Sequence, residues 1–288
     1  MNNLLSPQAG AVNRRGISGF TLVELMVSIV IGLVLIIFIS SLYLNSKASF
    51  RLNDDNARLQ EDGNYALTLI GRNLMQAGYG AMRTVSTTSF TGKGLVACDS
   101  GFASPLATTP SFACAGAAGE PGFTVSYSVD AYDSTNSPIS GIGADCNGNN
   151  AGGTAVNSFF IATKSGETSS SLFCNGNGST VSQPILNNVD HMVLTYGVDT
   201  TGAYAVSQFL STASAVSALP LNAANKGGWN QLVSITVCLE VHSENIVTTA
   251  AQTYQNCAGA STTATDKKLH ATLTRTFTLR NRAAPSLT

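Results

Sequence analysis

The 288-residue sequence has little charge of either sign. Asp, Glu, Lys and Arg make up 11% of it, and 15 basic against 16 acidic residues leave a formal net charge of −1. Proteins that attract nucleic acid or anionic lipid through their net field carry a strong excess of positive charge. The sequence therefore argues against a basic nucleic-acid-binding protein, and we expect no nucleic acid contact.

The common motifs of enzymes are missing as well. The sequence contains no GxSxG, HExxH or P-loop motif and no GxGxxG motif after a strand. The three histidines occur singly and are expected on the surface or on strands: His191, His242 and His270. Asp145, Asn147 and Asn149 alternate as calcium ligands do, but the Gly at the sixth position and the Glu at the twelfth are absent. We therefore expect a loop there, no catalysis, and no metal or cofactor.

Cysteine is scarce and does not occur before residue 98. The six cysteines form no CxxC motif and have no His at metal-ligand spacing: Cys98, Cys114, Cys146, Cys174, Cys238 and Cys257. Their even number favours disulfides and an oxidising compartment, with buried free thiols as the alternative. Six cysteines allow fifteen connectivities. We favour the pairs of sequence neighbours, 98 with 114, 146 with 174 and 238 with 257, because short loops close with little topological demand.

Against this background of low charge stands one long apolar run. Residues 25–44 contain no charge and no proline, and twenty helical residues cover the roughly 30 Å of a bilayer core. A cleaved secretory signal is the alternative, but its apolar region would be shorter and a small-residue cleavage site would follow. Arg14–Arg15 also resembles part of a twin-arginine signal, but the run is too long for one. The sequence predicts a membrane-spanning helix, and the cysteines place the chain after it outside the cytoplasm.

The segment that precedes the run resembles the type IV prepilin motif. Arg14–Arg15, Gly19, Phe20 and Glu24 stand at the spacing of that motif, in which a basic leader ends in Gly and the mature chain begins with Phe. The resemblance implies that a prepilin peptidase cuts between Gly19 and Phe20 and methylates the new Phe20 amine. It also implies that Glu24 pairs with the N-terminal ammonium of an adjacent subunit and so sets the register of assembly. The alternative is a Glu24 solvated at the headgroup level; deeper in the bilayer its carboxylate would cost about 2 to 3 kcal/mol or more.

Two periodicities follow the run. Residues 45–77 continue without proline, with apolar residues mainly three, four and seven apart, which predicts an amphipathic helix that ends at Gly78–Gly80. Gly63 and Gly71 are expected to loosen this helix locally. Later segments alternate with period two and predict antiparallel strands at 123–129, 158–163, 171–174, 192–198, 207–210, 233–241 and 269–279. We expect the helix to cover the apolar face of the sheet, the polar face to be solvated, and residues 141–153 and 212–228 to be loops.

Further blocks are similar to the PilW family of minor pilins. They are residues 71–80 (GRNLMQAGYG), Asn188–Asp190, Tyr196–Asp199, Trp229 and Leu279–Arg282. With the leader they span nearly the whole chain, although residues 84–187 match only in style. The resemblance implies an α+β fold, in which a long N-terminal transmembrane and amphipathic helix packs on a disulfide-bonded antiparallel β-sheet domain.

The resemblance also implies how the chain is divided and where it resides. We expect a leader at 1–19, a long helix at 20–80 with its transmembrane part at 25–44 and its amphipathic part at 45–78, and a β-rich head at 81–288. The chain would be a single-pass inner-membrane protein with a periplasmic C-terminal domain, and then part of a cell-surface pilus.

By the same resemblance, the function would be that of a minor pilin that enters the pilus in few copies and primes its assembly near the tip. Its partners would be other minor pilins, the major pilin, the prepilin peptidase, the inner-membrane assembly platform and a tip adhesin. The nearest alternative is a minor pseudopilin of a type II secretion system. An alternative of another class is a membrane-tethered adhesin that enters no filament.

Overall fold

The computed structural model describes residues 19–80, 94–116, 119–129, 143–248 and 250–281 of the chain. The leader expected at 1–19 therefore lies, except for Gly19, outside the described residues. Helix α1 (Leu22–Gln76) is the longest element. The chain divides into two compact units, residues 1–50 and residues 51–288. Each unit is described by itself below.

The first unit consists of the N-terminal part of α1. This helix is long and apolar enough to cross a membrane by length and composition. The structure thus contains the long N-terminal helix that the sequence predicts. It begins at Leu22 and ends at Gln76.

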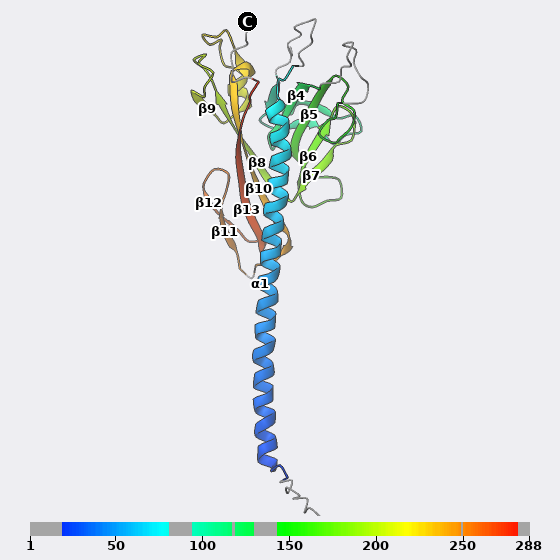
Figure 1. Ribbon diagram of the computed structural model, residues 1–288, viewed down its shortest axis with the longest axis vertical. Coiled ribbons are helices and arrows are strands. Elements are labelled where there is room, and N and C mark those ends of the chain that lie inside the picture. The colour runs from blue at the N-terminus through cyan, green and yellow to red at the C-terminus, as the bar shows by residue number, and fades with distance from the viewer. Residues whose placement is uncertain (1–18, 81–93, 117–118, 130–142, 249, 282–288) are drawn as a thin grey trace, which may run out of the picture. The chain divides into compact units, whose positions relative to one another are not determined.

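The second unit contains two antiparallel sheets and the last part of α1 (Figure 1). One sheet has the order β1 (Leu95–Cys98), β4 (Gly122–Ser128), β5 (Thr154–Ala162), β6 (Ser171–Gly176) and β7 (Gln183–Asn187). The other has the order β13 (Lys268–Thr278), β10 (Leu232–Ile246), β8 (Val189–Val198) and β9 (Gln208–Leu210). Two small hairpins are formed by β2 (Phe102–Ser104) with β3 (Ser111–Cys114) and by β11 (Gln252–Gln255) with β12 (Ser261–Ala264). Each strand predicted from the sequence is present.

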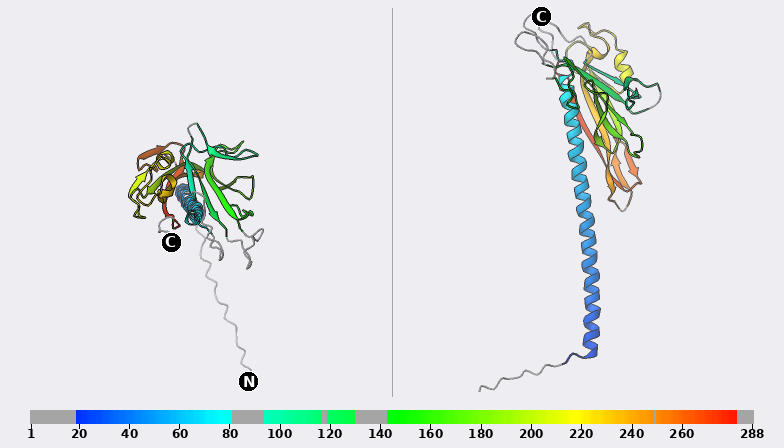
Figure 2. Two further views of the ribbon diagram at one scale, coloured as in Figure 1. Left: turned by 90° about the horizontal axis from the view of Figure 1, so that it is seen from above. Right: turned by 90° about the vertical axis from the view of Figure 1, so that its right-hand side faces the viewer.

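The apolar stripe of α1 packs against both sheets. In Figure 2, the last part of the helix runs along the two sheets, with one sheet on each side of it. The helix contributes its buried apolar side chains to one large core: Leu59, Ala66, Leu67, Ile70 and Leu74. The same core contains Phe123 and Phe159 of one sheet and Ile235 and Leu239 of the other. The helix therefore completes the core between two sheets, where the sequence suggested one.

Gly78 and Asn281 satisfy the C-terminal end of α1. Gly78 has a φ of 73°, the left-handed conformation in which glycine commonly terminates helices. Its N–H donates to the Ser126 carbonyl of β4 over 2.9 Å, and Ser128 N–H donates to the Tyr79 carbonyl over 2.8 Å. The side-chain amide of Asn281 donates to the carbonyls of residues 75, 76 and 77 at 3.2 to 3.4 Å. The two blocks around Tyr79 and Asn281 thus meet at the C-terminus of the helix.

Gly63 and Gly71 lie against side chains of β13. A Cβ at Gly63 would overlap the Leu273 side chain, and a Cβ at Gly71 would overlap the Phe277 ring. Both glycines therefore allow β13 to approach the helix closely, a role that the sequence analysis did not assign to them, and α1 continues through both positions. Arg275 lies between these two contacts on β13, and its Nη1 donates to the Thr68 hydroxyl of α1 over 3.2 Å.

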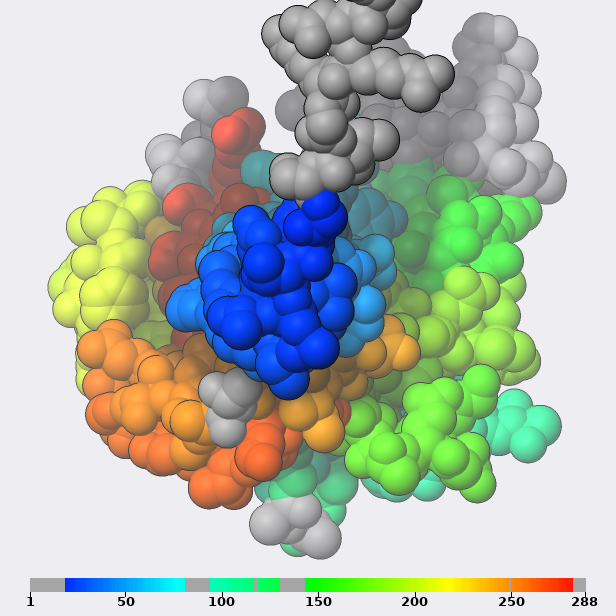
Figure 3. Space-filling view, turned by 90° about the horizontal axis from the view of Figure 1, so that it is seen from below, coloured from blue at the N-terminus to red at the C-terminus, as the bar shows by residue number. Residues whose placement is uncertain are grey.

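The outer face of the β13–β10–β8–β9 sheet is partly covered, although the sequence suggested a solvated face. The Cys238–Cys257 disulfide fastens the β11–β12 hairpin to this face. Tyr254 of the hairpin stacks on His270 with ring centroids 5.0 Å apart. Figure 3 shows the hairpin (orange) at the surface of the second unit. The hairpin was not predicted, because β11 and β12 are short and rich in Gln and Thr.

The segment 212–228 is also more ordered than a loop. Helix α2 (Ala213–Ser217) lies within it, and Thr212 caps the helix by accepting a hydrogen bond from Ala215 N–H over 3.3 Å. A 3-10 turn, η1 (Gly228–Gln231), begins at its end. Strands β1, β2, β3 and β7 were not predicted either. They are short strands of three to five residues, and short strands carry little periodic signal.

Three disulfides cross-link the second unit. They join Cys98 to Cys114, Cys146 to Cys174, and Cys238 to Cys257, which are the pairs favoured from the sequence. With the long apolar helix and the antiparallel sheets, they give the α+β, disulfide-bonded fold class that the sequence predicts.

Candidate functional site

The start of α1 is the first part of the candidate site. The Thr21 hydroxyl accepts a hydrogen bond from Glu24 N–H over 3.2 Å, and the Thr21 carbonyl accepts one from Leu25 N–H over 3.1 Å. Thr21 is therefore the N-cap of the helix, and Thr21 to Glu24 has the sequence form of a capping box. The sequence analysis missed Thr21, although a Thr three residues before a Glu and next to an apolar run is the recognised signal.

Nothing in the described chain requires the residues that precede this cap. A Cβ added at Gly19 would meet no atom within 4 Å. Phe20 is 78% exposed and contacts no core. Neither packing nor backbone conformation within the described residues explains why Gly and Phe stand at positions 19 and 20.

Glu24 lies in the first turn of the helix with its carboxylate exposed. A negative charge is favourable there because the helix N-terminus carries partial positive charge. Within the described residues the carboxylate has no ion pair or side-chain hydrogen bond. Only the Glu24 backbone is engaged: its N–H donates to the Thr21 hydroxyl, and its carbonyl accepts a hydrogen bond from Ser28 Oγ over 2.7 Å. The carboxylate is therefore available to a cation from outside the chain.

The apolar surface after Glu24 is also uncovered. No large hydrophobic side chain between Leu25 and Leu44 is buried by the described chain, and most are more than half exposed. Soluble monomers rarely expose a contiguous apolar surface of this size unless it binds a membrane or another protein. A bilayer or a bundle of similar helices would cover it.

The residues that carry the family resemblance in the second unit have structural roles. Asp199 is buried, and its carboxylate accepts hydrogen bonds from the backbone N–H groups of residues 201–204 at 2.7 to 3.3 Å. Burial raises the pKa of Asp199, but these hydrogen bonds lower it by more, so the pKa lies below its usual value. Trp229 packs edge-on against Tyr196, with ring centroids 5.6 Å apart. These blocks therefore fix a loop and a core contact.

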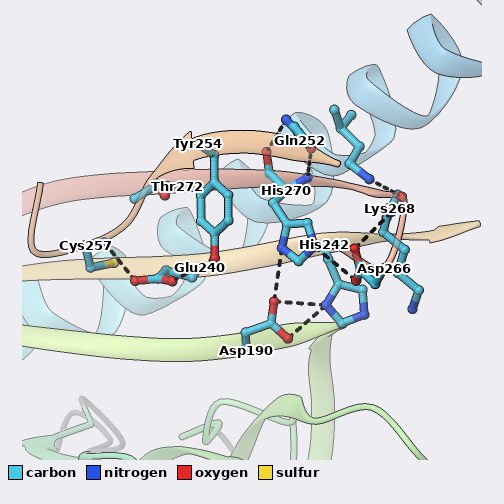
Figure 4. A network of polar contacts seen from close by, with 12 residues as sticks. Asp190, Glu240, His242, Gln252, Tyr254, Cys257, Asp266, Lys268, His270 and Thr272 are labelled. Carbon is cyan, nitrogen blue, oxygen red and sulfur yellow. Dashed lines mark hydrogen bonds and ion pairs between the residues drawn. The ribbon is translucent and has the colours of Figure 1, made fainter. Parts of the chain in front are cut away.

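A cluster of polar side chains lies on the outer face of the β13–β10–β8–β9 sheet (Figure 4). His242 Nδ1 is 2.9 Å from Asp190 Oδ1, and His270 Nε2 is 3.1 Å from both oxygens of Asp266. His242 and His270 are both strand residues, as expected, but their side chains are only 8% exposed. Cys257 N–H of the hairpin donates to Glu240 over 2.8 Å. The polar residues of this face thus anchor the β11–β12 hairpin.

His191 forms a separate contact at the surface. Its Nδ1 is 2.8 Å from Glu120 Oε1, while Glu120 Oε2 accepts a hydrogen bond from Met192 N–H over 3.0 Å. The hydrogen bond with Glu120 is the main reason that the pKa of His191 lies above its usual value. Nearby carboxylates add to the effect, while partial burial opposes it.

The segment that resembles a calcium loop is held by backbone N–H groups that donate to the Asp145 carboxylate. Asp145 Oδ1 accepts hydrogen bonds from Asn147 N–H at 2.9 Å and Asn149 N–H at 2.8 Å, and Asp145 Oδ2 accepts one from Gly178 N–H at 3.0 Å. The described residues contain no group of three His, Cys, Asp or Glu side chains that could hold a metal ion. Asp145 therefore acts as the centre of a loop that is also closed by the Cys146–Cys174 disulfide.

Two family models match parts of this chain. Residues 158–281 match the model of the family described as "Type IV Pilus-assembly protein W", PilW. Residues 14–40 match the prokaryotic N-terminal methylation motif. A solved structure, a type IV-like pilin from Thermus thermophilus, is similar at 13% identity and a TM-score of 0.40, with 79% of this chain and 99% of that chain covered. The comparison with curated proteins gave no match.

Proposed function

We propose that the chain is a PilW-type minor pilin of the type IV pilus, because residues 158–281 match the PilW family model and residues 14–40 match the N-terminal methylation motif. The observation that carries the proposal is the uncovered apolar helix that begins directly after the Gly19–Phe20 junction of the methylation motif. Such a helix serves first as a membrane anchor and later as the packing element of a filament. The family and fold are structural, and we propose no catalytic activity.

The junction would be processed by a prepilin peptidase. Neighbouring atoms of the described chain do not require a glycine at position 19. A small residue there would instead allow the protease to bring the scissile bond into its active site. Cleavage would leave Phe20 as the N-terminal residue, and methylation would follow on its amine. The new ammonium group and Glu24 would then lie within the first helical turn.

Glu24 would set the axial register of the helix in the filament. Apolar helices can slide along one another, because their contacts depend little on register, whereas one ion pair in an apolar setting selects a single position. The free carboxylate at the start of α1 would pair with the Phe20 ammonium of a neighbouring subunit. The Thr21 hydroxyl already accepts the hydrogen bond from Glu24 N–H. The Glu24 carboxylate is therefore not needed to cap the helix and stays free for this pairing.

The remaining part of the proposal concerns location and copy number. An apolar helix after the methylation motif is consistent with a membrane-anchored pilin, and three disulfides favour a periplasmic C-terminal unit and later the cell surface. The head proposed for residues 81–288 would crowd its neighbours along a tightly packed shaft. We therefore propose that the chain enters pili in few copies near the tip, where it primes assembly with other minor pilins. The major pilin, the inner-membrane assembly platform and a tip adhesin would be its other contacts.

The mature N-terminus tests the proposal directly. Mass spectrometry of the chain from membranes should find N-methylated Phe20 and no residue from 1–19, and Gly19→Leu should leave the full-length precursor. Glu24→Ala should be cleaved normally but recovered from sheared pili at a much lower level than wild type. An intact Met1 terminus in the wild-type chain would refute the proposal.

Copy number and gene deletion test the finer part. Quantitative proteomics of sheared pili should find far fewer copies of this chain than of the major pilin. Deleting its gene should remove most surface pili while the major pilin remains in the membrane, because initiation fails and subunit supply does not. A ratio near one to one, or normal piliation without the gene, would contradict a priming role.

A further inference from the structure

Strand β9 lies at an open edge of the β13–β10–β8–β9 sheet (Figure 1). Its three residues, Gln208 to Leu210, pair with Val198 to Tyr196 of β8, and within the described residues no strand pairs with its other side. The outer side of such a strand presents backbone N–H and C=O groups that the sheet does not pair. No residue of β9 belongs to the N-terminal site described above, so this edge needs an explanation of its own.

The other three outer strands of the two main sheets are protected. β7 contains Pro184, which has no N–H to donate, and its pairing with β6 has an irregularity. β1 is mostly buried, with Leu95 and Cys98 at most 5% exposed, and α2 contacts it. On β13, the side-chain amide of Gln252 donates to the His270 carbonyl over 3.2 Å and accepts from His270 N–H over 2.7 Å. Pairing with other parts of the chain therefore blocks each of these edges at least in part.

β9 lacks these protections. It contains no proline, and its pairing with β8 has no irregularity. Charged side chains are another common protection of sheet edges, yet residues 200–225 contain no Asp, Glu, Lys, Arg or His. Gln208 is exposed, and Phe209 is 64% exposed. An uncharged edge with an exposed aromatic ring is the kind of edge to which another chain can add a strand.

The pairing of Phe209 gives a second and independent indication. Its partner on β8 is Gly197, which has no side chain to set beside the ring. A Cβ at Gly197 would overlap the Ser234 hydroxyl and lie 3.1 Å from the Val206 side chain, so the position is restricted to glycine by its surroundings. Directly opposite side chains are the pairs that stabilise a sheet. The Phe209 ring can therefore gain such a neighbour only from a strand on its open side.

We propose that β9 pairs with an extended, uncharged segment of another pilus subunit, which adds a strand to this sheet and sets an apolar side chain beside Phe209. The inference rests on the proposed function, because it takes the partner to be part of the pilus. It assigns the second unit a contact that is separate from the pairing of Glu24 in the apolar helix. Backbone hydrogen bonds hold the segment, and Phe209 selects the side chain that lies opposite it.

A charge on the edge tests the pairing without disturbing the core. Phe209→Lys places a solvated ammonium group where the incoming strand would lie. The amount of this variant in sheared pili should fall about five- to tenfold, as the loss of a short strand pairing and one apolar contact would give. Val181→Lys is the matched control, since Val181 is 62% exposed and lies between β6 and β7, outside both strands. It should enter pili as the wild type does, and both variants should keep the near-UV circular dichroism of the wild type.

Photo-cross-linking of intact pili identifies the partner segment and keeps an aromatic ring on the edge. Benzoylphenylalanine in place of Gln208 or of Phe209 should, on irradiation, link this chain to another pilus subunit. Because paired strands match residue by residue, peptide mapping should place the links from the two positions on neighbouring residues of one uncharged segment. The same group in place of Val181 is the control and should not link to that segment.

The outcomes separate failure of this inference from failure of the proposed function. If the wild-type chain is absent from pili, the proposed function fails and this inference fails with it. If the wild type is present but the links are absent, scatter over unrelated segments or join two copies of this chain, the inference is wrong and the proposed function stands. Equal abundance of Phe209→Lys and Val181→Lys in pili, at any level, would also overturn the inference, because the edge would then have no effect of its own.

Discussion

Asn73 is a polar residue on the buried face of α1, and it connects the helix to a sheet. Its Oδ1 accepts hydrogen bonds from Tyr127 Oη at 3.2 Å and from Asn157 Nδ2 at 2.6 Å. Asn157 Oδ1 in turn accepts a hydrogen bond from Cys146 N–H over 3.0 Å. Burial is the main reason that the pKa of Tyr127 is raised, so its hydroxyl remains a donor. The network fixes the position of the helix along β4 and β5 more sharply than apolar packing alone.

Removing the Asn73 side chain should therefore cost more than its size suggests. Asn73→Ala leaves the buried Tyr127 hydroxyl without its acceptor and leaves the Asn157 amide with Tyr127 Oη alone, at 3.2 Å. We therefore expect a loss of about 2 to 3 kcal/mol in the free energy of unfolding. Urea denaturation of the full chain in detergent, followed by the fluorescence of the single tryptophan, Trp229, measures it. Asn64→Ala on the exposed side of the same helix is the control and should change stability by less than about 0.5 kcal/mol. Equal effects of the two variants would show that the network contributes nothing.

His191 makes stability depend on pH near neutrality. Its pKa is raised in the folded chain, chiefly by the hydrogen bond with Glu120, so the contact contributes fully below the unfolded pKa of about 6.5 and is lost as pH rises through the folded value. Because the His191 side chain is 58% exposed, the contribution should be no more than about 1 kcal/mol. The stability difference between wild type and His191→Gln should thus be larger at pH 5.5 than at pH 8.5. A difference that is constant or grows with pH would contradict the contact.

At the scale of elements, the contact between α1 and β13 depends on two glycines. Replacing Gly71 by Ala should raise helix propensity by about 1 kcal/mol, yet its Cβ would overlap the Phe277 ring. Because overpacking a core costs about 1 to 3 kcal/mol, we expect a net loss of stability. The same tryptophan-monitored unfolding measures it.

A second substitution separates the clash from other effects of Gly71→Ala. Phe277→Leu makes room for the new methyl group, so the double variant should lose less stability than the sum of the two single variants. Strict additivity would mean that Gly71 acts on the helix alone. The sign of the coupling thus decides whether Gly71 permits close packing or merely loosens the helix.

At the scale of the whole molecule, one continuous helix serves two units. Residues 25–44 are uncharged, mostly apolar and exposed, whereas Leu59, Leu67, Ile70 and Leu74 belong to the core of the second unit. A chain that starts at residue 51 should therefore fold and remain soluble without detergent. A chain that starts at residue 81 lacks the helix that completes the core, so it should aggregate or lose fixed tertiary structure. Size-exclusion chromatography with near-UV circular dichroism distinguishes the two, and equal behaviour would refute the shared-helix interpretation.

The sequence by itself determined the parts of this protein that depend on local pattern. The long helix and the main strands could be predicted, because each depends on a pattern of neighbouring residues. These patterns are a twenty-residue apolar run, a proline-free amphipathic stretch that ends at Gly78, and alternation with period two. The family resemblance likewise rested on local blocks, such as the residues around Gly19 and Glu24. Neighbouring cysteines gave the same three pairs that the structure contains, because each pair closes a short loop.

Only the tertiary structure decided what depends on distant residues meeting. The closeness of Phe277 to Gly71, the Asn73–Asn157 contact and the capping of α1 by Asn281 each join positions far apart in the chain. A periodic pattern states which face of an element is apolar, but it does not state which element covers that face. For the same reason the division of the strands into two sheets and the hairpin over His270 could not be predicted, since each is created by packing and carries no local signal.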